Sequence, residues 1–209
     1  MSYDAFATTF SNSRKNLHWP ELEYIIADMI AHGSTSVLDI GCGNGRFIEQ
    51  SLGSGLFMKH YFWIDSSSWM IWEAEKLYPT DELYNFDVCS MQSFVYVKWM
   101  QKYNSILLLA SFHHLESQEE RIQVLENTKK LLKPNGRIYM TNWNLRDQAK
   151  YETSHRWDGD YDIKIGAYSR YYHGFTVDEL AELFEETGYR VIENRIFDWG
   201  RNFLSILSL

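Results

Sequence analysis

The residue types that are scarce in this chain limit what it can be. Cysteine occurs twice in 209 residues, at Cys42 and Cys89, which is too few for a disulfide framework or a cysteine-based zinc site. No apolar run reaches the length of a membrane-spanning helix, and the first residues lack the basic and apolar regions of a signal peptide. We therefore expect a cytoplasmic protein with no membrane association and no metal site.

Basic residues are also few. The chain has 20 Lys and Arg against 28 Asp and Glu, a net charge of −8. Proteins that bind nucleic acid regardless of its sequence depend on Lys and Arg, so this balance disfavours a broad nucleic-acid surface but leaves room for a local basic patch. The length and the 45% hydrophobic content fit one sizeable globular domain over 1–209.

Short apolar runs alternate with helical patterns along the chain, which is typical of βαβ units and a mostly parallel sheet. The sequence therefore predicts an α/β fold. A turn is expected at Pro134-Asn135-Gly136, and a helix begins after Thr176, which forms a capping box with Glu179. The expected strands are 36–41, 60–65, 82–87, 104–110, 135–141, 191–197 and 203–207, and the other helices are 45–53, 68–78, 90–101 and 119–132.

Two segments lie outside this alternation. Residues 1–33 are expected to form an N-terminal cap that is helical from Trp19 to Ala31. Residues 142–175 form a long segment rich in Tyr, Asp, Arg and His. Segments of this length within a domain are usually functional or mobile. We predict that 142–175 is an insert on the substrate side of the fold.

A glycine-rich loop follows the first expected strand, in Val37-Leu38-Asp39-Ile40-Gly41-Cys42-Gly43-Asn44-Gly45. Glycine permits positive φ and a close backbone approach to a ligand, and the next helix offers free N–H groups. The spacing G-x-G-x-G differs from the dinucleotide fingerprint G-x-G-x-x-G. Asp39 would repel a pyrophosphate, but it suits a cationic ligand. A nicotinamide-dependent oxidoreductase is therefore disfavoured, and a simple turn or an inactive scaffold remain alternatives.

This segment resembles motif I of the class I S-adenosylmethionine-dependent methyltransferases. The resemblance implies a Rossmann-like fold with a mostly parallel seven-stranded sheet, helices on both faces, and S-adenosyl-L-methionine as cofactor. It also implies that Asp65 holds the ribose hydroxyls and that Asp87 reads the adenine amino group, with helix capping as the alternative for each. The implied cofactor-binding residues are Asp39, Gly41, Cys42, Gly43, Gly45, Asp65, Ser66, Asp87, Val88 and Ala110.

Two further features leave alternatives open. His113 and His114 follow the fourth expected strand and suggest a general base, but adjacent histidines point in different directions and cannot chelate a metal together. Trp63 stands where many members of the resembling family carry glycine, with Trp69 and Trp72 nearby. Either this region packs around aromatic rings, or its tryptophans are UGA codons that the organism reads as glycine.

The run Tyr168-Ser169-Arg170-Tyr171-Tyr172-His173 resembles the methyltransferases that esterify carboxymethyl groups on wobble uridines of tRNA, and 10–14 resembles the same group's entry segment. The resemblance implies that Arg170 binds the carboxylate, with Arg14 as a second candidate. Tyr171 or Tyr172 would stack on a base, and His173 would bond the substrate. Core packing and surface salt bridges are the alternatives.

The acceptor that this resemblance implies is a carboxylate on a modified tRNA wobble uridine. Eukaryotic members of that group use a small activating protein partner, which is an option for this chain. The alternative acceptor is a small molecule, methylated on oxygen or nitrogen beneath the insert as a lid.

Overall fold

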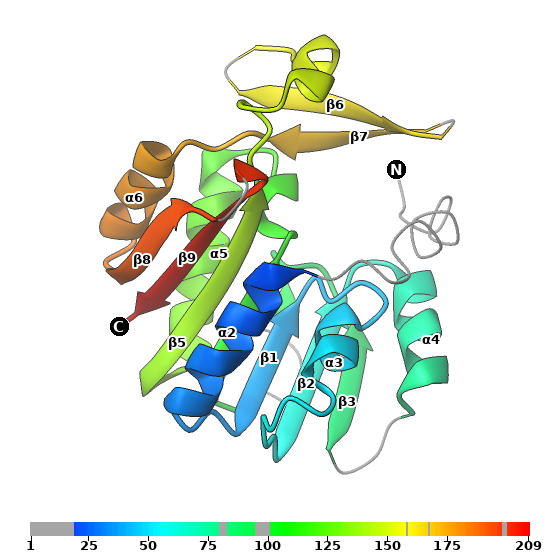
Figure 1. Ribbon diagram of the computed structural model, residues 1–209, viewed down its shortest axis with the longest axis vertical. Coiled ribbons are helices and arrows are strands. Elements are labelled where there is room, and N and C mark those ends of the chain that lie inside the picture. Colours follow the sequence, from blue (N-terminus) through cyan, green and yellow to red (C-terminus); the bar gives the residue numbers. More distant parts are fainter. Residues whose placement is uncertain (1–18, 80–82, 95–100, 158, 167, 198–199) are drawn as a thin grey trace.

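The computed structural model describes residues 19–79, 83–94, 101–157, 159–166, 168–197 and 200–209. Its main sheet has seven strands in the order β3-β2-β1-β4-β5-β9-β8 (Figure 1). The first five strands in this order are parallel, and β9 runs antiparallel to both of its neighbours. The expected mostly parallel seven-stranded sheet is confirmed. The strands are β1 Ser36–Ile40, β2 His60–Asp65, β3 Tyr84–Val88, β4 Tyr103–Leu109, β5 Leu132–Trp143, β8 Arg190–Ile196 and β9 Asn202–Ser208.

Helices cover both faces of this sheet (Figure 1). Alternate side chains of β1 point to opposite faces, as a strand requires. Val37 packs with the apolar side chains of the three helices on one face, whereas Leu38 packs with those of the two helices on the other face. The helices are α2 Pro20–Ala31, α3 Arg46–Ser51 and α4 Ser68–Leu77 on one face, and α5 Gln118–Leu131 and α6 Val177–Glu186 on the other. No helix in the described parts of the chain is long and apolar enough to cross a membrane.

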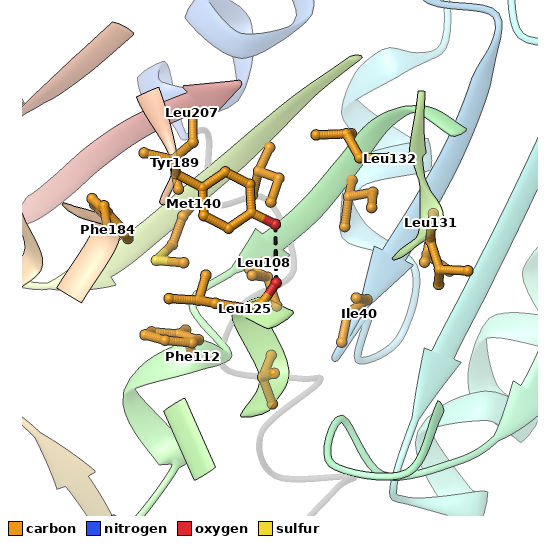
Figure 2. Packing of buried hydrophobic residues seen from close by; sticks show 14 of the residues in the cluster. Ile40, Leu108, Phe112, Leu125, Leu131, Leu132, Met140, Phe184, Tyr189 and Leu207 are labelled. Atoms are coloured by element: carbon orange, nitrogen blue, oxygen red, sulfur yellow. Dashed lines mark hydrogen bonds between the residues drawn. The ribbon is translucent and has the colours of Figure 1, made fainter. Parts of the chain in front are cut away.

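Figure 2 shows part of the core beneath α5 and α6. Leu108 and Met140 of the sheet pack there with Phe184 of α6. The buried Tyr189 hydroxyl donates a hydrogen bond to the Leu125 carbonyl oxygen at 3.0 Å. This polar atom is therefore paired inside an otherwise apolar layer.

One local expectation is wrong and another is not supported where it can be checked. Residues 134–136 do not form a connecting turn but lie within β5, where the β4–β5 register shifts between Tyr103 and Ser105. Residues 90–94 of the helix expected over 90–101 contain no α-helix, since 91–93 form a turn, and residues 95–100 lie outside the described residues. The expected helix over 19–31 is confirmed as α2.

The segment predicted as an insert contains a short 3₁₀ helix, Ala149–Ser154, and an antiparallel hairpin. The hairpin strands are β6 Asp160–Ile165 and β7 Tyr168–His173. They form a separate two-stranded sheet beyond the carboxyl ends of the parallel strands, at the top of Figure 1. The insert begins later than expected, since β5 continues to Trp143.

Candidate functional site

A cavity of about 400 Å³ lies between the glycine loop and the hairpin, at the carboxyl ends of β1, β2 and β4. This volume suits a small-molecule ligand, and this end of the sheet is where open α/β folds bind ligands. Of the residues predicted from the sequence, those that line the cavity are Asp39, Gly41, Cys42, Gly43, Asp65, Ser66, Ala110, His114, Arg170, Tyr171 and Tyr172.

The glycine loop is held between two neighbouring strands. The amides of Gly41 and Cys42 both donate to the Ile64 carbonyl oxygen of β2, at 2.8 and 3.0 Å. On the other side, the Ser111 hydroxyl donates to the Ile40 carbonyl oxygen at 2.8 Å. Gly41 has φ +76°, and a Cβ atom there would lie 2.5 Å from the Ser111 Cβ. Glycine at 41 is thus required both by the backbone conformation and by the approach of Ser111.

Gly43 and Gly45 face different surroundings. Gly43 has φ +57°, and a Cβ there would meet no atom within 4 Å, so a side chain would enter open space at the cavity wall. Gly45 has φ +85°, and a Cβ there would lie 2.7 Å from Trp63. Gly45 is not among the described residues that line the cavity. Gly45 instead lies against Trp63, which is fully buried and packs on Tyr61 and Tyr84.

Asp65 connects the end of β2 to the loop. Its Oδ2 accepts a hydrogen bond from the Gly43 amide at 2.9 Å, and its Oδ1 accepts one from the Ser67 amide at 2.9 Å. Each carboxylate oxygen has further acceptor capacity, so the side chain can still receive ligand hydroxyls. The helix-capping alternative for Asp65 is wrong, because the Ser67 hydroxyl caps α4 by accepting from the Met70 amide.

Asp39 is 1% exposed, and its two carboxylate oxygens differ. Oδ2 accepts a hydrogen bond from the Tyr61 hydroxyl at 2.5 Å, whereas Oδ1 is buried with no hydrogen-bond partner among the residues that the structure describes. Burial raises the pKa of Asp39 to about 7, with the Tyr61 hydrogen bond opposing the rise and the charge of Asp65 adding to it. A buried carboxylate oxygen at the wall of a cavity fits a cationic ligand group. The amino group and sulfonium of S-adenosylmethionine have this character.

Ala110 follows β4 and has φ +50°, alone among the described non-glycine residues in having a positive φ. Its amide donates to the Thr141 carbonyl oxygen and to the Thr141 hydroxyl, both at 3.0 Å. This backbone conformation is sparsely populated and costs about 1–3 kcal/mol, a cost that is concentrated at functional sites.

Arg170 and Tyr172 of β7 form the hairpin side of the cavity. The Arg170 guanidinium carbon lies 5.8 Å from the centroid of the Tyr172 ring, which stacks on Trp143 at 5.0 Å. Burial lowers the pKa of Arg170 to about 10. The guanidinium therefore keeps its charge at neutral pH, backed by aromatic faces.

Tyr171 and His173 engage a different set of partners. The Tyr171 hydroxyl and His173 Nδ1 both donate to Asp160 Oδ1, at 2.7 and 2.9 Å. His173 Nε2 donates to Glu179 Oε1 at 2.6 Å, so the expected capping box is only half formed: the Thr176 hydroxyl accepts from the Glu179 amide. Burial raises the pKa values of Asp160 and Glu179, but the hydrogen bonds from His173 outweigh it, so the pKa of each carboxyl group is lowered. These contacts attach the hairpin to α6.

Apart from His114, the remaining expected site residues lie outside the cavity lining or outside the described chain. Asp87 and Val88 end β3 without lining the cavity, although the following residues 89–92 do. His113 is buried and its Nδ1 accepts from the Trp143 amide at 3.2 Å, while His114 Nδ1 donates to the Tyr171 carbonyl oxygen at 3.1 Å. Arg14 lies outside the described residues.

Sequence reasoning did not find Ser111, Tyr61, Arg46 or Trp19. Ser111, Arg46 and Trp19 line the cavity, and the Arg46 guanidinium lies 4.8 Å from the centroid of the Trp19 ring. Arg46 directly follows the glycine loop and could have been found from that position. In the described part of the chain, no three His, Cys, Asp or Glu side chains gather as a metal site requires.

Comparison with known proteins points in one direction. A methyltransferase domain family model matches residues 9–194. The tRNA (carboxymethyluridine(34)-5-O)-methyltransferase of Schizosaccharomyces pombe is 25% identical over 218 residues, covering 92% of this chain and 88% of that protein. The mouse tRNA (carboxymethyluridine(34)-5-O)-methyltransferase ALKBH8 is 25% identical over 162 residues, covering 73% of this chain and 21% of its own length.

Solved structures share the fold. An S-adenosylmethionine-dependent methyltransferase from Clostridium acetobutylicum superposes with a TM-score of 0.74 at 12% identity, covering 99% of this chain and 98% of the other. CalS10 of Micromonospora echinaspora, an amino pentose methyltransferase solved with bound S-adenosylmethionine, superposes with a TM-score of 0.70 at 15% identity, over 100% and 98% of the two chains.

Replacing Gly41 by alanine tests the contact between the loop and Ser111. We expect Gly41→Ala to weaken S-adenosylhomocysteine binding roughly 5- to 150-fold, since overpacking of this kind costs about 1–3 kcal/mol. The measurement is isothermal titration calorimetry. Gly53→Ala is the matched control, because Gly53 also has φ +76° but a Cβ there meets nothing within 4 Å. Adding Ser111→Gly to Gly41→Ala should restore part of the affinity, and equal losses in both alanine variants would contradict this account.

Replacing His173 by glutamine tests the attachment of the hairpin. His173→Gln should lower the free energy of unfolding by about 1–3 kcal/mol, since charge-assisted hydrogen bonds to two carboxylates are lost. Urea denaturation measures this, with the exposed His60→Gln as control. We expect cofactor affinity to stay unchanged. Unaltered stability together with lost turnover would instead give His173 a direct contact with the substrate.

Proposed function

The chain belongs to the methyltransferase domain family, and we propose that it methylates a carboxylate on a modified wobble uridine of tRNA. The protein is an S-adenosylmethionine-dependent methyltransferase with a Rossmann-like class I fold, as its family and structural neighbours are. The observation that most supports the proposed acceptor is the position of Arg170, a charged guanidinium at the cavity wall with an aromatic ring behind it.

A guanidinium at this place suits a planar anion. Arginine binds a carboxylate bidentately, which fixes both the position and the plane of the acceptor group. Tyr172 and Trp143 lie beside it with their rings 17° from parallel. Tyr172 is 1% exposed and Trp143 also stacks on Tyr151 at 6.3 Å, so these rings back the guanidinium, and the expected stacking of a base on Tyr172 is wrong. The S. pombe and mouse relatives carry the same acceptor in their names, which supports this assignment.

The reaction needs little proton chemistry. S-adenosylmethionine supplies a methyl group on a sulfonium, and a carboxylate oxygen forms the new C–O bond as the C–S bond breaks. A carboxylate is already ionised near neutral pH, so no general base is required. The residues of the chain have to exclude water and align the acceptor. His113 is buried and His114 lines the cavity, but a carboxylate acceptor needs neither of them as a base.

Each part of the cavity has a separate task in this proposal. The glycine loop and Asp65 hold the cofactor, with Asp39 facing its cationic part. Arg170 orients the acceptor carboxylate from the opposite side. The network of Tyr171, His173 and the two carboxylates holds β7 in place, so Arg170 is presented by a strand that is fixed at the residues next to it.

A small-molecule acceptor is the second candidate, supported by the net charge of −8 and by neighbours such as CalS10 that are named for small-molecule methylation. The hairpin would then act as a lid. Both candidates use the same cofactor, so the acceptor alone distinguishes them.

Methyl transfer to tRNA is the direct test of the acceptor. The protein is incubated with methyl-labelled S-adenosylmethionine and with tRNA that carries unmethylated carboxymethyluridine. We expect label that ribonuclease removes and that mild base releases, as a methyl ester requires. Base-stable label in the RNA would contradict ester formation. Cofactor binding without transfer to RNA, either alone or with a cell extract that supplies an activating partner, would favour the small-molecule acceptor.

Arg170→Ala should lower kcat/KM for the acceptor roughly 10- to 150-fold, because a charge-assisted hydrogen bond contributes about 1.5–3 kcal/mol. Cofactor affinity, measured by calorimetry, should stay within about a factor of two. Arg156→Ala is the control, since Arg156 precedes β6, is half exposed and pairs with Asp162 at 2.8 Å. A loss of cofactor affinity in Arg170→Ala, with an unchanged KM for the acceptor, would contradict the assigned role.

A further inference from the structure

Tyr61 lies outside the cavity lining, yet its hydroxyl determines how Asp39 faces the cavity. It donates to Asp39 Oδ2 and leaves Oδ1 buried at the cavity wall, without a partner among the described residues. Both residues are 1% exposed. The carboxylate therefore has one oxygen fixed by the protein, while the other has no partner among the described residues although Asp39 lines the cavity.

Aromatic packing prevents Tyr61 from turning away. Its ring stacks on Phe47 of α3 at 5.9 Å and meets the edge of Trp63 at 5.4 Å. It also contacts Tyr84 of β3, 6.4 Å away between ring centroids. Burial raises the pKa of Tyr61 well above its usual value, so its hydroxyl remains a hydrogen-bond donor at every pH at which the protein works.

We propose that Tyr61 is a positioning residue for Asp39, and that binding of the cationic cofactor to the free Asp39 oxygen releases a proton from this carboxyl group. Tyr61 touches neither cofactor nor substrate and acts through Asp39. The inference concerns the cofactor and does not depend on the identity of the methyl acceptor.

The charges around Asp39 support this coupling. Asp65 from β2 faces it and Cys42 lies in the loop above it, while β4 contributes the apolar Leu107 opposite. Arg46 lines the same cavity. Burial raises the pKa of Asp39 to about 7, so the free protein holds this carboxyl partly protonated at neutral pH. A cation favours the charged carboxylate and lowers that pKa. Cofactor affinity must then increase as pH rises toward and through 7.

Calorimetric titration with S-adenosylmethionine tests the proton release in the unaltered protein. At pH 7, titrations in buffers of different ionisation enthalpy should show release of about half a proton per cofactor bound, as the Asp39 pKa of about 7 requires. Between pH 5.5 and 7.0 the affinity should rise by up to about sixteenfold. This range stays below the usual pKa of an amino group, about 7.7–8.0, so the ligand itself changes little. No proton release, or an affinity independent of pH, would overturn the proposal.

Tyr61→Phe separates positioning from simple packing. The ring stays, but the hydrogen bond that lowers the Asp39 pKa is lost, so the pH dependence of affinity should move to higher pH and affinity at pH 7 should fall. Tyr189→Phe is the control, because it removes a buried tyrosine hydroxyl bonded to Leu125 on the opposite face of the sheet (Figure 2). Asp39→Asn should abolish the proton release. An unmoved pH profile in Tyr61→Phe, or an equal shift in Tyr189→Phe, would reduce Tyr61 to a core residue.

Discussion

The glycine loop after β1 is tied to the strands on both of its sides, and the cavity exists because of that constraint. The Ile64 carbonyl oxygen of β2 accepts two loop amides, while Ser111, just beyond β4, reaches the Ile40 carbonyl oxygen. The space left at Gly41 admits no side chain. The loop is thereby held open above the sheet, with Asp39 and Asp65 beneath it and the hairpin facing it.

The sequence was informative wherever function depends on neighbours along the chain. Three glycines at alternate positions next to an acid required a loop that approaches a ligand closely, and Asp65 ended a recognisable apolar run. The alternation of apolar runs and helical patterns likewise predicted the sheet, because each βαβ unit folds from contiguous residues. The turn predicted at 134–136 is absent because turn-forming residues can also form an irregularity inside a strand, as they do in β5.

The roles of the hairpin residues could not be predicted from their adjacency in the sequence. Arg170, Tyr171 and His173 were grouped as one substrate site because they are adjacent, but in β7 neighbouring side chains point to opposite faces. Arg170 and Tyr172 share one face of the strand, and Tyr171 and His173 share the other, where both donate to Asp160. Treating 168–173 as a strand, in which side chains alternate between two faces, would have separated Arg170 and Tyr172 from Tyr171 and His173. The partners Asp160, Glu179 and Tyr61 come from other strands and helices, and only the fold brings them together.

In the proposed function the cavity holds two ligands, the cofactor at the glycine loop and the acceptor at the hairpin. A crystal structure of the protein with S-adenosylhomocysteine tests that division most directly. We expect the ribose hydroxyls at Asp65, the amino group at Asp39 Oδ1, and the sulfur directed toward Arg170 with open space between them. A ligand whose sulfur points away from the hairpin, or whose bulk fills the space in front of Arg170, would contradict the account.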